Sequence, residues 1–103
     1  MSKKVFISQP MKGLSDEEIL DERARMTQLV IEKYPDDEIE FLDTFFQGAP
    51  AEARPLWYLA KSLEFLSTAD VAVFAPRWEE FRGCRIEHTC AVEYGIDVID
   101  CGF

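Results

Sequence analysis

The stretch Val71-Ala72-Val73-Phe74-Ala75 decides the fold class, because five consecutive apolar residues are typical of a strand buried on both faces. A loop at residues 76–83 follows it, and then a helix is predicted from Cys84 to Tyr94, ended by Gly95. The apolar run from Ile96 to Cys101 predicts the next strand. A strand, a helix and a second strand in this order form a right-handed crossover between parallel strands.

The same alternation continues toward the N-terminus. Residues 4–8 form a short apolar run that predicts a first buried strand, and a loop with breaking residues follows. Ser15 and Glu18 have the spacing of a capping box, which predicts the start of an amphipathic helix that ends at Pro35.

The middle of the chain adds a second strand and a second helix. Residues 38–42 alternate like a short edge strand, and residues 43–50 form a loop-like segment with an apolar surface. A helix is expected from about residue 51 to residue 66, with Pro55 acceptable only in its first turn. The order βαβαβαβ predicts a three-layer α/β fold of the flavodoxin or Rossmann type, with a parallel sheet of four or five strands, as a single domain over residues 1–103.

Composition limits the class of partner. The chain has 20 acidic and 11 basic residues, a formal charge of −9, so we expect no nucleic-acid polymer as partner. No window is long and apolar enough to suggest a membrane span or a secretion signal, so we expect no membrane partner and a cytoplasmic protein. Three cysteines without a Cys-x-x-Cys pattern are expected to be free thiols.

Parallel strands gather their ligands at their carboxyl ends, where the loops that follow them meet. After the first strand this loop contains Ser8, Gln9, Pro10, Met11, Lys12 and Gly13. Its backbone N–H groups, its hydroxyl and Lys12 suit a phosphate or a sugar hydroxyl, although a lysine such as Lys12 is more often a surface lysine than a phosphate anchor. With one glycine, the loop lacks the three that a dinucleotide fingerprint needs.

The loop after the third strand is locally basic. Arg77, Arg82 and Arg85 fall within nine residues of an acidic chain, and Trp78 offers an aromatic face for a base or a sugar. We favour ligand contact for Arg82, next to Gly83. The alternative is a solvated face in which the arginines pair with neighbouring acidic residues, namely Glu79, Glu80 and Glu93.

Glu87 is the candidate for chemistry. The pattern places it in the first turn of the third helix, where N–H groups and the helix dipole favour an ionised carboxylate. This environment suits a nucleophile better than a proton donor. The alternative is an acid that only complements the dipole.

Cys84, Glu87 and His88 also raise a zinc hypothesis, because Cys84 and His88 stand four residues apart on one helical face. The fourth ligand is missing and the chain has one histidine, so we expect no metal. Asp70 precedes the third strand, at the wrong end of the sheet for the ligand crevice, and is expected to cap or turn the chain.

Two motifs resemble a known family. They are Val-Phe-Ile-Ser-Gln-Pro-Met-Lys-Gly at residues 5–13 and the run from Ala69 to Ala91, which contains Pro-Arg-Trp-Glu-Glu-Phe-Arg-Gly-Cys-Arg-Ile-Glu-His-Thr-Cys at residues 76–90. Together they resemble small phage and bacterial proteins of unknown function related to nucleoside 2-deoxyribosyltransferases.

The resemblance implies a function and a site. Glu87 matches the family's catalytic glutamate, with Ala91 one helical turn on, and residues 8–13 match the loop that lines the sugar or 5′-phosphate pocket. The implied reaction is cleavage of the N-glycosidic bond of a nucleoside or nucleotide, by hydrolysis or by transfer, with no cofactor. Relatives complete each pocket from a neighbouring subunit, which implies a homo-oligomer.

This chain departs from the family at several positions. Gln9 stands where the family has glycine, and Ile7 is the nearest counterpart of a tyrosine. Lys61 and Ser62 stand where relatives carry an aspartate, so a second acid is not identifiable unless the 79–80 pair supplies it. Two further hypotheses therefore remain open, a module that binds a nucleotide without cleaving it and a structural protein that keeps the fold.

Overall fold

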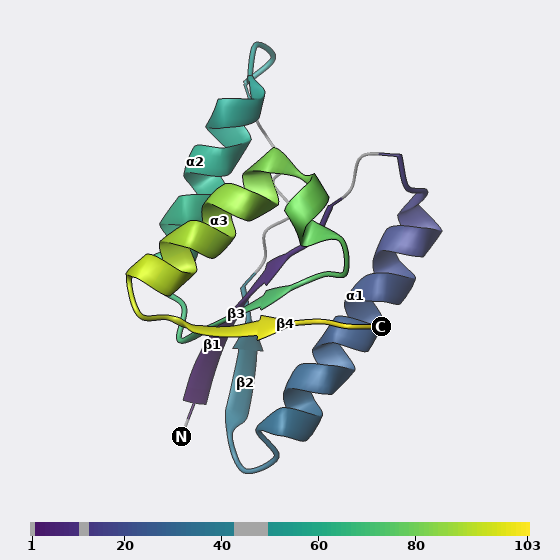
Figure 1. The fold of residues 1–103 in the computed structure, drawn as a ribbon, viewed down its shortest axis with the longest axis vertical. Helices are drawn as coiled ribbons and strands as arrows, with labels where there is room; N and C mark the ends of the chain where they lie inside the picture. The colour runs from purple at the N-terminus through teal and green to yellow at the C-terminus, as the bar shows by residue number, and fades with distance from the viewer. Residues whose placement is uncertain (1, 11–12, 43–49) are drawn as a thin grey trace.

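The structure is a computed structural model that describes residues 2–10, 13–42 and 50–103. Its strands form one parallel sheet in the order β2-β1-β3-β4 (Figure 1). The strands are β1 (Ser2–Ser8), β2 (Glu38–Phe41), β3 (Val71–Phe74) and β4 (Asp97–Asp100). The helices are α1 (Asp16–Lys33), α2 (Pro55–Leu66), α3 (Arg82–Glu93) and a short 3-10 turn at Trp78–Glu80.

Helices cover both faces of the sheet, as Figure 1 shows, with α1 on one face and α2 and α3 on the other. Alternate residues of β1 separate the two cores: Val5 and Ile7 pack with Met26 and Val30 of α1. On the opposite face Phe6 packs with other buried residues, which are Leu66, Ala72, Phe74 and Ala91. The predicted three-layer α/β architecture is therefore confirmed.

The strand order creates a switch point between β1 and β3. The chain leaves β1 toward β2 on one side, and it enters β3 on the other side of β1. Ser8 and Phe74 are register partners at the ends of these strands, and the Ala75 N–H donates to the Ser8 carbonyl over 3.0 Å. Ligand crevices of doubly wound sheets lie at this location.

Local signals explain where the elements begin. Ser15 caps α1 in the predicted capping box, with the Glu18 N–H donating to Ser15 Oγ over 3.1 Å. Asp70 was expected to cap or turn the chain, but its carboxylate instead accepts from the Lys4 N–H of β1 over 2.8 Å, 66 positions away in the chain. The described part of the chain contains no helix long and apolar enough to cross a membrane.

Two helix boundaries differ from the sequence prediction. α2 begins at Pro55 and not at residue 51, since proline has no N–H to leave unpaired at the first helical position. α3 begins at Arg82 and not at Cys84, which moves Glu87 from the first turn of the helix into the second. The predicted loop at residues 43–50 lies, apart from residue 50, outside the described residues.

Candidate functional site

A buried hydrogen bond joins the end of β1 to α3. Ser8 Oγ donates to Glu87 Oε1 over 2.6 Å, although the two residues are 79 positions apart in the chain. Ser8 is 2% exposed and Glu87 is 8% exposed. The structure therefore brings together two predicted site residues from different motifs, at the carboxyl end of β1.

The helix dipole was expected to favour the ionised form of Glu87 and so to lower its pKa, and this direction was wrong. Burial raises the pKa of Glu87, while side-chain hydrogen bonds with Ser8 and Ser62 lower it less. The helix dipole acts only within the first turn of α3, and Glu87 lies beyond that turn in a desolvated position. When ionised, this carboxylate has little water around it, so its charge is poorly solvated. Reaction with an electrophile removes that charge and is therefore favoured.

Ser62 was missed as a site residue. It is half-buried on α2 and hydrogen-bonds with Glu87. The only signal in the sequence was its position, since the resemblance noted above places an aspartate of nucleoside 2-deoxyribosyltransferases there. Two hydroxyl groups, from β1 and α2, thus hold one carboxylate of α3.

Cys84 lies next to this group. Burial raises the pKa of its thiol, hydrogen bonding with Ser8 lowers it, and the charge of Glu87 raises it again. A protonated, buried thiol is a poor nucleophile. We therefore assign no chemistry to Cys84.

The His88 ring makes contacts within the protein that do not favour a role as a metal ligand. Its ring stacks on Trp78 with centroids 3.8 Å apart and planes 7° apart, and its Nε2 lies 3.0 Å from Asp100 Oδ1. Among the described residues no group of three or more His, Cys, Asp or Glu side chains is arranged to hold a metal ion. This geometry gives no support to the zinc hypothesis for Cys84, Glu87 and His88.

The described residues of the loop after β1 have different surroundings. The Gln9 amide donates to the Ile19 carbonyl over 2.7 Å and to Glu22 Oε1 over 3.2 Å, which ties this side chain to α1. Pro10 is buried, and Gly13 has a φ of +85°, a conformation that favours glycine. The predicted contacts of Met11 and Lys12 lie outside the described residues.

The residues that follow β3 also differ in their surroundings. The stacked His88 covers one face of the Trp78 ring, and Phe74 lies 5.8 Å away from it. Arg85 donates to the Glu79 carbonyl over 2.8 Å. Arg82 is exposed and lines a groove together with Gly83.

This groove, of about 370 Å³, lies between the N-terminal halves of α2 and α3. Its walls are Pro55, Leu56, Leu59, Arg82, Gly83 and Ile86. The sequence analysis missed the three α2 residues, because leucines at helical spacing indicate a core face as readily as a binding wall.

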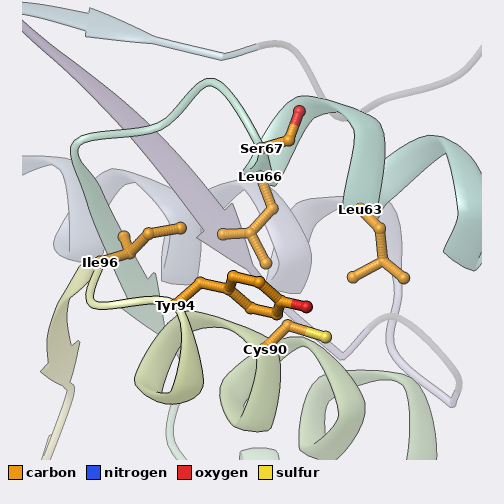
Figure 2. A pocket seen from close by; sticks show the side chains of 6 residues that line it. All are labelled: Leu63, Leu66, Ser67, Cys90, Tyr94 and Ile96. Atoms are coloured by element: carbon orange, nitrogen blue, oxygen red, sulfur yellow. The ribbon is translucent and has the colours of Figure 1, made fainter.

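Two other pockets lie elsewhere. A pocket of about 430 Å³ lies at the C-terminal ends of α2 and α3. Tyr94 lies near Cys90 in this pocket (Figure 2). Its other walls are Leu63, Leu66, Ser67 and Ile96. A polar pocket of about 320 Å³ on the α1 side includes Arg77, which has a left-handed backbone with φ 67°. Glu87 is not in the wall of any of these three pockets of described residues.

Comparisons with protein-family models, curated proteins and solved structures find no match for this chain. The geometry at the switch point is therefore the basis for a function.

Proposed function

We propose that this chain cleaves the N-glycosidic bond of a nucleoside or nucleotide, with Glu87 as the nucleophile. The observation that supports it most is the buried 2.6 Å hydrogen bond between Ser8 and Glu87, at the carboxyl end of β1 beside β3. A carboxylate held at this point of a parallel sheet is placed where such folds bind small ligands. The resemblance to nucleoside 2-deoxyribosyltransferases gives the reaction class.

The reaction balances with this chain's own residues. A carboxylate oxygen of Glu87 attacks C1′ of the sugar as the C1′–N bond breaks, and the bonding electron pair leaves with the base. The base takes a proton from solvent. Water, or the nitrogen of a second base, then breaks the glycosyl ester and restores the carboxylate.

The surroundings of Glu87 tune this step. Ser8 and Ser62 orient the carboxylate and stabilise its charged form, while burial raises the pKa of Glu87. A nucleophile must be ionised, so the rate should rise with pH through the raised pKa. If Glu87 were the proton donor, the rate would fall across the same range.

Base release from a panel of nucleosides and 5′-monophosphates tests the proposal, with and without a free base as acceptor. We expect release by the wild-type protein and a loss of at least about 10³-fold in Glu87→Gln, because the amide cannot form the ester. Asp100→Asn is the control, since it changes a carboxylate on β4. Absence of release for every substrate, or full activity in Glu87→Gln, would refute the proposal.

One observation favours a second candidate function, binding of a nucleotide without cleavage. Ser62, which cannot protonate a leaving base as an acid does, is the α2 residue that contacts Glu87. A nucleotide that raises the melting temperature while no base is released from any substrate would support this alternative. Base release would exclude it.

A further inference from the structure

The groove between α2 and α3 has apolar walls that are left open. Leu56 is 71% exposed and Ile86 is 37% exposed, and both line the groove of about 370 Å³. Pro55 and Leu59 complete the apolar part. Concave sites with apolar walls and few polar groups are typical of binding sites for small ring molecules.

Gly83 has no role in the fold that requires glycine. It is the second residue of α3, its φ is not positive, and a Cβ added there would meet no atom within 4 Å. Glycine lowers helix stability, so neither the backbone nor the packing explains it. Its missing side chain leaves space in the wall of the groove.

Arg82 supplies the charged group of the groove. It forms no ion pair with another described residue and is exposed. A guanidinium has donors only, so it selects acceptor atoms of a ligand. The apolar walls with one set of donors fit a flat ring that has a carbonyl oxygen at its edge.

Helix spacing connects the groove to Glu87. Glu87 follows Gly83 by four positions, and Ser62 follows Leu59 by three, so both lie about one turn further along the same two helices. A base in the groove would therefore lie about one helical turn from the positions of Ser62 and Glu87.

We infer that this groove binds the leaving base and prefers 6-oxopurines and 4-oxopyrimidines over their amino counterparts. The inference rests on the proposed function for the identity of the ligand. Arg82 donates to the oxo group, Gly83 makes room for the ring, and the leucines and Ile86 cover its faces.

Binding of free hypoxanthine and adenine to the Glu87→Gln protein, followed by calorimetry, tests the inference without catalysis. We expect hypoxanthine to bind about tenfold more tightly, because adenine offers an amino donor where Arg82 needs an acceptor. Arg82→Met should abolish the preference. Gly83→Val should weaken the binding of both bases about tenfold or more. Gly83→Ala disturbs the helix less than valine and should weaken the binding of both bases to a smaller extent.

Arg85→Met is the matched control, since that guanidinium donates to a backbone carbonyl outside the groove. Equal affinity for the two bases, a preference that survives in Arg82→Met, or an unchanged affinity for both bases in Gly83→Val and Gly83→Ala would overturn the inference. If the wild-type protein releases bases but Arg82→Met keeps its base preference, the inference fails and the proposed function stands. If the bases bind as expected and none is ever released, the groove assignment stands and the proposed function fails.

Discussion

The Ser8 hydroxyl both orients Glu87 and lowers the pKa of its carboxyl group, against the effect of burial. In Ser8→Ala the lowering is lost, so the pKa of Glu87 should rise further. We expect the acid limb of the pH–rate profile to move to higher pH and the rate at neutral pH to fall about tenfold. Ser67→Ala, whose hydroxyl bonds to the Glu64 carbonyl, is the control. An acid limb that stays in place would contradict this role of Ser8.

Burial of Glu87 also makes folding stability depend on pH. Its pKa is higher in the folded protein than in the unfolded chain, so between the two values the folded state holds more protons. The contribution of Glu87 is therefore fully present below the unfolded pKa and is lost as the pH rises through the folded pKa.

Glu87→Gln should remove this pH-dependent loss of folding stability. We expect the variant to be more stable than wild type at neutral pH, by about 1 kcal/mol, because an amide is less costly to bury than a carboxylate. The difference should shrink on acidification below the folded pKa. Urea unfolding at several pH values measures it, and a variant less stable than wild type at neutral pH would contradict the account.

At the scale of single residues, the sequence predicted that Ser8 and Glu87 lie close together, because the carboxyl ends of neighbouring parallel strands meet at one edge of the sheet. The raised pKa could not be predicted, since it depends on how deeply α3 packs. The contact of Gln9 with α1 and the stacking of Trp78 on His88 also depend on tertiary packing.

Among the elements, α1 has the clearest start signal. Ser15 accepts from the Glu18 N–H, and Glu18 Oε1 accepts from the Ser15 N–H over 3.3 Å. Ser15→Ala should lower the free energy of unfolding by about 1 kcal/mol, since it leaves helix N–H groups unpaired. For a chain of this size the melting temperature should fall by about 4–8 °C. An unchanged melting temperature would show that the cap does not stabilise the helix.

The start of α3 carries the opposite expectation. Gly83→Ala should raise the free energy of unfolding by about 0.5 kcal/mol, because a Cβ at this helical position meets no atom and alanine is the better helix former. Thermal unfolding measures it, with Gly95→Ala as a contrast. Gly95 has a φ of +73°, so alanine there should destabilise the protein. Destabilisation by Gly83→Ala would mean that the fold itself needs this glycine.

The sequence predicted the type and order of these elements because their signals are local. Apolar runs gave the strands, and the capping box gave α1. The first residues of α2 and α3 were predicted at other positions, since the N-cap residues Arg54 and Phe81 provide no side-chain cap. This two-residue shift at α3 changed the predicted environment of Glu87.

For the whole molecule, the three layers followed from the alternation of strands and helices, but the neighbours of each strand did not. The order β2-β1-β3-β4 depends on which face each crossover takes, and it places Ser8 next to the end of β3. The groove and the pocket between α2 and α3 are likewise properties of the assembled fold. No local pattern contains either feature.

Attack of the Glu87 carboxylate on a sugar carbon would form a glycosyl ester that can be trapped. Incubation with 2′-deoxy-2′-fluoro nucleosides should slow the breakdown of the glycosyl ester and let it accumulate, because fluorine destabilises a transition state of oxocarbenium character. Mass spectrometry of the intact chain and of its peptides should then show one added fluorosugar on Glu87, with none in Glu87→Gln. Release of free base from a chain that stays unmodified, or that is modified at another residue, would contradict the account.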